Sequence, residues 1–190
     1  MPATALDSRT ALVVIDLQKG FASLPSVHPF RDVVANTVRL ARAFRSAELP
    51  VVLVTVTASV DGADIINTRT EAGRSRMPTT PGFGDLLPEL NAGPRDIRIT
   101  KRQPSAFYGT ELDLQLRRRS ISGIVLTGVS TSSGVDSTAR AAHERAYNIT
   151  FASDAMTDPD PANHEHVMTR VFPRYGEIDT TARILALLGC

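Results

Sequence analysis

The sequence predicts an α/β protein in which a parallel sheet is covered by helices on both faces. Short apolar runs alternate along the chain with segments whose apolar residues recur at helical spacing. Most of the runs are continuously apolar, which is typical of strands buried on both faces of a parallel sheet. The length of 190 residues fits one domain spanning residues 1–190.

The first half of the chain contains the clearest strand, helix, strand order. Residues 11–15 form an apolar run, and residues 33–47 repeat apolar side chains at helical spacing until Pro50, which cannot continue a helix. Residues 51–56 form a second apolar run. Residues 57–95 are rich in Gly, Pro, Thr and Arg and show little periodicity, which indicates a functional loop region with short helical pieces.

The second half of the chain continues the alternation of strand and helix. Further strands are expected at 96–100, 123–127, 148–152 and near 177–178. Further helices are expected at 111–119, 135–146 and 181–188. Asp160 followed by Pro161 is typical of an N-cap and a first helical position, so one more helix is expected from Pro161 onward.

Composition excludes several classes of function. The net charge of +1 argues against a nucleic-acid partner and against a polybasic membrane surface. No apolar run approaches the ~20 residues that cross a bilayer, and the N-terminal residues have no secretory pattern. The one cysteine is Cys190, so an intramolecular disulfide and a thiolate zinc cage are excluded. We therefore expect a cytoplasmic protein that binds a small-molecule substrate.

Polar residues follow three of the expected strands, where ligands of parallel sheets bind. Asp16 follows the first strand, and burial there favours its neutral form, which suits a general acid or base; capping a nearby loop is the alternative. Lys101 follows the third strand and is one of two lysines; a solvated surface lysine is its alternative. The small residues of 128–134 leave backbone N–H groups near a helix start, either for an anion or simply for a tight turn.

Three separated motifs resemble the isochorismatase-like hydrolase family. They are residues 10–18, Lys101 with 105–107, and 127–131 with 135–140. The resemblance covers nearly the whole chain and implies three α/β/α layers around a six-stranded parallel sheet in the order 3-2-1-4-5-6. It also implies an Asp, Lys and Cys triad, of which Asp16 and Lys101 are present. The Cys position falls on Gly134.

The glycine at this position separates the chain from the amidase members of the family, which attack with the Cys thiolate. Some nicotinamidases also bind a metal through an Asp-x-His motif after the second strand, but residues 57–61 contain no His. We therefore expect no metal and no cofactor. Ser132 and Ser133 adjoin Gly134, yet a serine nucleophile needs a neighbouring base and no His is near in sequence.

Cysteine-free isochorismatases of this family protonate the methylene carbon of an enol ether, and water then captures the oxocarbenium ion. The resemblance assigns Asp16 as the general acid, while Lys101 orients it and pairs with a substrate carboxylate. Lys101 favours the charged form of Asp16 and burial favours the neutral form, and the sequence leaves open which prevails. The alternative is a catalytically inactive member that binds a metabolite or a protein partner.

Further site residues are expected around Asp16, Lys101 and Gly134. Backbone N–H groups near Ser130 and Gly134 are expected to hold polar substrate atoms, and one arginine among Arg69, Arg74 and Arg76 is a candidate for a carboxylate. The expected substrate-binding residues are Gln18, Phe21, Phe107, Tyr108, Val129, Ser130, Thr131 and Ser133. The resemblance also implies a cis peptide at Val129–Ser130 and a homodimer or higher homo-oligomer.

Overall fold

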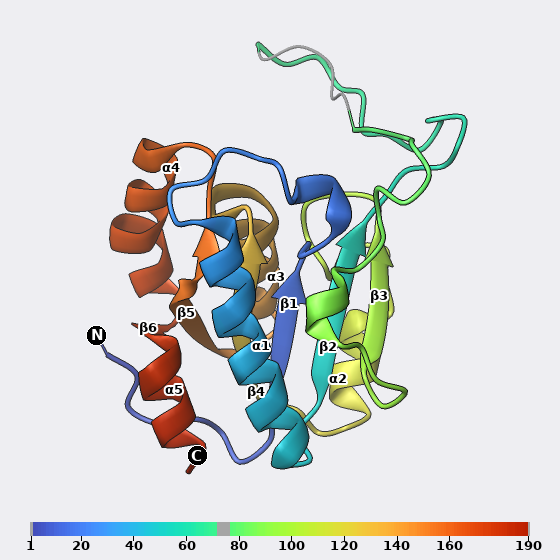
Figure 1. Ribbon diagram of the computed structural model, residues 1–190. Coiled ribbons are helices and arrows are strands. Elements are labelled where there is room, and N and C mark those ends of the chain that lie inside the picture. The colour runs from blue at the N-terminus through green and yellow to red at the C-terminus, as the bar shows by residue number, and fades with distance from the viewer. Residues whose placement is uncertain (1, 72–76, 190) are drawn as a thin grey trace.

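The computed structural model describes residues 2–71 and 77–189, and their centre is a six-stranded sheet in the order β3-β2-β1-β4-β5-β6 (Figure 1). Every neighbouring pair of strands is parallel. The strands are β1 (Thr10–Ile15), β2 (Val51–Val56), β3 (Ile97–Lys101), β4 (Gly123–Val129), β5 (Asn148–Thr157) and β6 (Glu177–Asp179). The predicted fold class and strand order are confirmed.

Helices cover both faces of the sheet. They are α1 (Phe30–Ser46), α2 (Leu112–Arg117), α3 (Asp136–Glu144), α4 (Pro161–His166) and α5 (Thr181–Leu187). Figure 1 shows α1 and α5 on one face and α2 and α3 on the other. Successive residues of a strand point to opposite faces, so Leu12 of β1 packs in the core under α1 while Val13 packs in the core under α3. None of the described helices is long and apolar enough to cross a membrane.

Two strands run further than their apolar patterns predict. β5 ends at Thr157 rather than 152, and β4 ends at Val129 rather than 127. The register between them shifts between Leu126 and Gly128, so that β5 accommodates extra residues whose polar side chains interrupt its apolar run. The additional length matters because it extends both strands at the carboxyl edge of the sheet, where ligands of parallel sheets bind.

The segment after Asp160 is helical but not continuous. The Asp160 side chain accepts hydrogen bonds from the N–H groups of Ala162 and Asn163, so the predicted N-cap is confirmed. The α-helix ends at His166 and continues as a π-helical turn and then a 3-10 turn that contains Pro173. Proline lacks the backbone N–H that a longer α-helix would need.

Residues 57–95 contain a projecting arm. Between β2 and β3 the structure assigns one short 3-10 helix, Pro88–Leu90, among the residues it describes. Figure 1 shows the chain leaving the end of β2 and extending away from the sheet. It returns beside the loop that follows β1, where the N–H groups of Lys19 and Gly20 donate to the carbonyls of Asp85 and Phe83. We refer to residues 57–71 and 77–82, the described part of this projection, as the arm.

Candidate active site

Asp16 lies at the end of β1 and is nearly enclosed by protein. β1 ends at Ile15, and Asp16 turns the chain with a φ of +54°, a left-handed conformation that Asp tolerates better than most residues. Its N–H donates to the carbonyl of Val54 in β2 at 3.0 Å, which keeps the turn attached to the sheet. The carboxylate is therefore fixed at the carboxyl edge of the central strand.

Lys101 is the last residue of β3 and reaches Asp16 across the end of β2. Its Nζ lies 2.7 Å from Asp16 Oδ2 and donates a second hydrogen bond, of 2.9 Å, to the carbonyl of Pro104. The two side chains are only 2% and 5% exposed. Parallel strands end at one edge of the sheet, which is why two residues so distant in sequence form a buried ion pair.

Burial decides the protonation equilibrium of Asp16. Loss of solvent raises the pKa of Asp16 from 3.8 to about 6, and this effect exceeds the charge attraction and hydrogen bond of Lys101, which lower the pKa. Asp16 Oδ1 is also buried and has no hydrogen-bond partner among the described residues. Its ionised form is thus incompletely compensated, and the carboxyl holds a proton at higher pH than an exposed aspartate.

Gly134 lies directly against this carboxylate. A Cβ atom at position 134 would lie 3.2 Å from Asp16 Oδ2, 3.0 Å from Ile15 Cγ2 and 3.2 Å from the carbonyl oxygen of Val129, which is tighter than ordinary packing. Gly134 belongs to a π-helical turn, Thr131–Val135, that follows β4. The missing side chain therefore keeps the face of the Asp16 carboxyl group uncrowded.

Hydrogen bonds hold the turn that carries Gly134. The backbone N–H and the hydroxyl of Ser132 donate to Asp158 Oδ2 at 2.7 and 2.8 Å, and Thr131 Oγ1 lies 2.9 Å from His164 Nδ1. The turn begins just after the cis peptide bond between Val129 and Ser130. The N–H groups of Ser133 and Val135 both donate to the carbonyl of Ser130, so they are committed to the turn itself.

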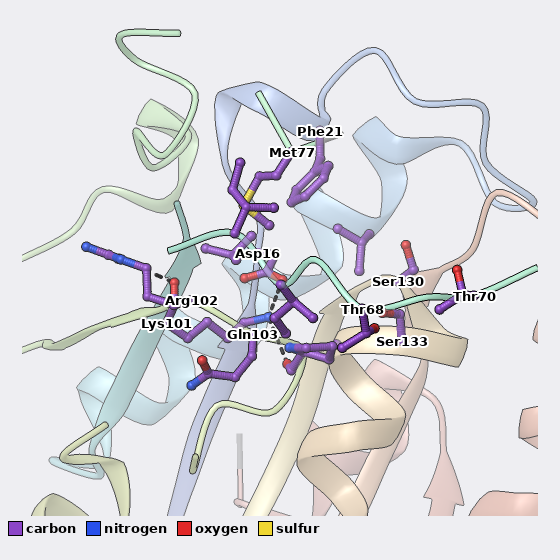
Figure 2. Close-up of a pocket in the computed structure, with 16 residues that line it drawn as sticks. Asp16, Phe21, Thr68, Thr70, Met77, Lys101, Arg102, Gln103, Ser130 and Ser133 are labelled. Carbon is purple, nitrogen blue, oxygen red and sulfur yellow. Dashed lines mark hydrogen bonds and ion pairs between the residues drawn. The ribbon is translucent and has the colours of Figure 1, made fainter. Parts of the chain in front are cut away.

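A cavity of about 480 Å³ opens over Asp16, Lys101 and Gly134. Figure 2 shows the hydroxyl side chains Ser130, Ser133 and Thr70 on one side of this pocket and Phe21 and Met77 on another. The lining residues are Asp16, Phe21, Val56, Ile65, Ile66, Thr68, Thr70, Met77, Lys101, Arg102, Gln103, Pro104, Val129, Ser130, Ser133 and Gly134. The mixture of apolar and hydroxyl groups suits a small, partly polar molecule.

The structure brings seven of the predicted site residues to this cavity. They are Asp16, Phe21, Lys101, Val129, Ser130, Ser133 and Gly134. The other four predicted substrate-binding residues, Gln18, Phe107, Tyr108 and Thr131, do not line it, and each has a different physical reason.

Gln18 is buried and bonded to backbone rather than facing the cavity. Its Nε2 donates to the carbonyls of Val56 and Phe83, both at 2.9 Å, and its Oε1 accepts from the N–H of Val56 at 2.8 Å. The side chain joins the ends of β1 and β2 to Phe83, which directly follows the arm. Gln18 ends the first of the three family motifs, but its amide is occupied by the backbone of Val56 and Phe83.

Two aromatic residues and a threonine also lie elsewhere. Phe107 is buried in the core beside Tyr147, with ring centroids 5.8 Å apart. Tyr108 follows it, faces outward and is 72% exposed. The hydroxyl of Thr131 is turned to His164, so it contacts the neighbouring helix α4.

The remaining candidates from the sequence are three arginines and the cysteine. Arg69 is exposed on the arm and does not line the cavity, while Arg74, Arg76 and Cys190 lie outside the described residues. Within residues 2–71 and 77–189, no three His, Cys, Asp or Glu side chains come together as a set of metal ligands.

Several residues of the site were not found from the sequence. Arg102, Gln103 and Pro104 directly follow β3, so the rule that placed Lys101 at a strand end also applied to them. Asp158 follows β5, but the interrupted apolar run concealed where that strand ends. The arm residues Ile65, Ile66, Thr68, Thr70 and Met77 had no sequence signal, because only the return of the arm brings them to the cavity.

A parallel α/β sheet with a buried acid–ammonium pair in a cavity at its carboxyl edge defines a class, the α/β proteins that take a small molecule at the ends of their strands. Comparison with known proteins narrows this class. Residues 10–183 match the isochorismatase domain family. The isochorismatase family protein YecD of Escherichia coli O157:H7 is 41% identical over 190 residues, with 94% of this chain and 96% of the relative covered. The chain therefore belongs to the isochorismatase family.

Solved structures agree with this assignment. An isochorismatase family protein from Burkholderia thailandensis matches with a TM-score of 0.95 and 42% identity, with 98% of each chain covered. N-carbamoylsarcosine amidase from Thermoplasma acidophilum matches with a TM-score of 0.73 and 29% identity, covering 91% of this chain and 96% of that chain. The relatives thus include an amidase, and the protein is a hydrolase of this family.

Proposed function

We propose that this protein hydrolyses a small metabolite with Asp16 as general acid and without a cysteine nucleophile, and that the favoured reaction is hydrolysis of an enol ether of the isochorismate type. The observation that carries the proposal is the buried Asp16 carboxyl group, with its pKa raised to about 6, beside Lys101 and the uncrowded position of Gly134. A carboxyl group that retains its proton near neutral pH is what a general acid requires.

The proposed reaction uses few protein groups. Asp16 donates its proton to the methylene carbon of the enol ether, which leaves an oxocarbenium ion and an Asp16 carboxylate. Lys101, 2.7 Å away, stabilises that carboxylate. Water adds to the cation and returns one proton to Asp16, and the hemiketal then breaks down to an alcohol and a methyl ketone. Burial favours the acid before the transfer and Lys101 favours the anion after it.

Gly134 also supports the exclusion of thiol chemistry. The amidase members that the sequence resembles attack with a Cys at this position, and a side chain here would crowd Asp16 Oδ2 at 3.2 Å. The same glycine supports the alternative, a family member that binds a metabolite without turning it over. Retention of the buried ion pair, which is costly to desolvate, favours catalysis over binding alone.

The test is a substrate panel with an Asp16→Asn variant. Isochorismate, 2-ethoxyacrylate, amides and ureides are assayed for turnover, and circular dichroism confirms that the variant is folded. We expect turnover of an enol ether that falls above about pH 6 and decreases by about 10²–10⁴-fold in Asp16→Asn. Activity that survives this substitution contradicts the general-acid role, and a panel without turnover favours the binding alternative.

Thiol alkylation tests the absence of a cysteine nucleophile. Cys190 is the one thiol of the chain, so iodoacetamide should leave activity unchanged. Inactivation that follows specific modification of Cys190 would contradict the mechanism. The homo-oligomeric state and the cytoplasmic location stay predictions; light scattering during size-exclusion chromatography measures the first.

A further inference from the structure

We propose that Arg102 is the specificity residue that binds a carboxylate of the substrate, and that Asp64 of the arm holds the Arg102 guanidinium until the substrate carboxylate replaces it. The inference rests on the proposed function, because it assigns a second anchor in the same cavity. The substrates expected from this assignment are small organic acids.

Lys101 is poorly placed to bind a substrate carboxylate, contrary to what the family resemblance implied. Its Nζ already binds Asp16 Oδ2 and the Pro104 carbonyl, and its side chain is only 2% exposed. A ligand in the cavity would have to displace one of these buried partners. Lys101 therefore serves Asp16, and a substrate anion needs another cation.

Arg102 is that cation among the described residues that line the cavity. The charged lining residues are Asp16, Lys101 and Arg102, and the first two form an ion pair. When Asp16 carries the proton that the mechanism needs, Lys101 has no counter-charge within the lining, and Arg102 is offset only by Asp64, which lies outside the lining. The cavity wall then has a positive potential, which favours an anion over a neutral ligand of the same shape.

The contact between Arg102 and Asp64 uses only part of the guanidinium. Arg102 Nε lies 2.7 Å from Asp64 Oδ2, and Nη1 makes a long contact of 3.5 Å with the carbonyl oxygen of its neighbour Lys101. Arginine binds a carboxylate best through two parallel N–H donors, which this one-point ion pair does not provide. Both side chains are also partly exposed, at 43% and 33%, where ion pairs are weak.

Asp64 does not depend on Arg102 for its own position. Its Oδ1 accepts hydrogen bonds from the N–H and hydroxyl of Ser59, at 2.7 and 2.9 Å, and the backbone bond from Ser59 lowers the pKa of Asp64. The arm thus presents a fixed, ionised carboxylate. When a substrate carboxylate engages Arg102, Asp64 stays bound to Ser59, and the Arg102 guanidinium returns to Asp64 after product release.

The position of the Arg102 guanidinium suits a residue that binds the part of the substrate furthest from Asp16. Figure 2 shows Lys101 directed to Asp16, whereas the Arg102 guanidinium is directed away from Asp16. A small acid whose reactive carbon faces Asp16 would extend its carboxylate outward along the cavity. The long side chain of Arg102 can rotate to meet that carboxylate once its contact with Asp64 is broken.

Binding of benzoate and benzamide, measured by titration calorimetry, tests this proposal without any turnover. The two probes have nearly the same size and differ in charge. We expect Arg102→Gln to weaken benzoate binding by about tenfold or more and to leave benzamide binding within about twofold. Arg102→Lys should bind benzoate more tightly than Arg102→Gln but less tightly than the wild type, because lysine keeps the positive charge and loses the paired N–H donors of arginine.

Two further variants separate charge recognition from a structural effect. Asp64→Asn removes the competing carboxylate, so benzoate should bind about threefold to tenfold more tightly while benzamide binding is unchanged. Arg69→Gln, an exposed arginine of the arm outside the cavity lining, is the matched control and should change neither affinity.

Three results would overturn the proposal. Equal weakening of both probes by Arg102→Gln would make Arg102 a support for the arm. Unchanged binding of both probes would place the carboxylate elsewhere. Wild-type protein that fails to prefer benzoate over benzamide would show that the cavity does not select an acid. If charge selection is found but no enol ether is hydrolysed, the proposed function fails and the specificity inference stands.

Discussion

Asp16 Oδ2 and Lys101 Nζ lie 2.7 Å apart although their strands are not neighbours in the sheet. β2 separates β1 from β3, and the lysine side chain spans its end. Both groups are almost completely excluded from solvent. Because the pair is buried, its protonation controls both the stability of the fold and the proposed chemistry.

Removing the ammonium should destabilise the fold in a pH-dependent way. Lys101→Met leaves a buried carboxylate without its cation, so we expect a loss of about 3–5 kcal/mol in the free energy of unfolding near pH 8. The loss should be smaller near pH 5, because Asp16 without Lys101 has a pKa raised still further and is protonated there. Urea unfolding at the two pH values measures the difference.

Lys19 provides the matched control for this experiment. It is the other lysine of the chain, and its ion pair with Asp85 is more than half exposed on both sides. Lys19→Met should therefore change the unfolding free energy by less than about 1 kcal/mol at either pH. Equal effects of the two substitutions would mean that the Asp16–Lys101 pair contributes no more than a surface contact.

The raised pKa of Asp16 also predicts how wild-type stability depends on pH. The folded protein binds the Asp16 proton up to about pH 6, while the unfolded chain releases it near 3.8, so stability falls as pH rises between these values. The contribution of this group amounts to about 3 kcal/mol. Above about pH 6 the difference should be constant.

Asp16→Asn isolates this contribution from those of other groups. The variant has no proton to release at this position, so the difference in unfolding free energy between wild type and variant should follow the Asp16 titration. Denaturant unfolding at a series of pH values measures it. A difference that does not change between about pH 4 and pH 6 would show that burial does not raise the pKa.

The glycine at position 134 should resist even a small side chain. Gly134→Ala places a Cβ 3.0–3.2 Å from Ile15, Asp16 and Val129, so we expect a cost of about 1–3 kcal/mol in stability. Turnover should fall by about tenfold or more, because the methyl group crowds the acid. Gly93→Ala, whose Cβ would approach only Asp96 Oδ2 at 3.9 Å, is the control. Unchanged kinetics in Gly134→Ala would remove the glycine from the mechanism.

Gln18 should matter for stability rather than for charge recognition. Gln18→Leu leaves the N–H and carbonyl of Val56 and the carbonyl of Phe83 without this partner, so we expect a loss of about 3 kcal/mol by urea unfolding. Gln115→Ala removes a bond to the exposed Arg119 and should cost less than about 1 kcal/mol. Equal stability of Gln18→Leu and wild type would contradict the bridging role.

Local patterns were sufficient for most of the sheet. The apolar runs place β1 and β2 to within a residue, and the placement of Asp16 and Lys101 at strand ends follows from them. The pattern fails at β5, where polar residues inside the strand mark a register shift that only pairing with β4 reveals. It also fails after Asp160, where the helix changes type.

The sequence by itself determined which segments are buried strands and that an acid and a lysine follow two of them, because burial periodicity and strand ends are local properties. The tertiary structure decided which groups meet. Asp16 and Lys101 are 85 residues apart, and Gln18 and Phe83 are 65 apart. Their contacts depend on strand order and on the return of the arm. The pKa of Asp16 depends on how much protein surrounds the carboxyl group, a property of the packed fold that no short stretch of sequence contains.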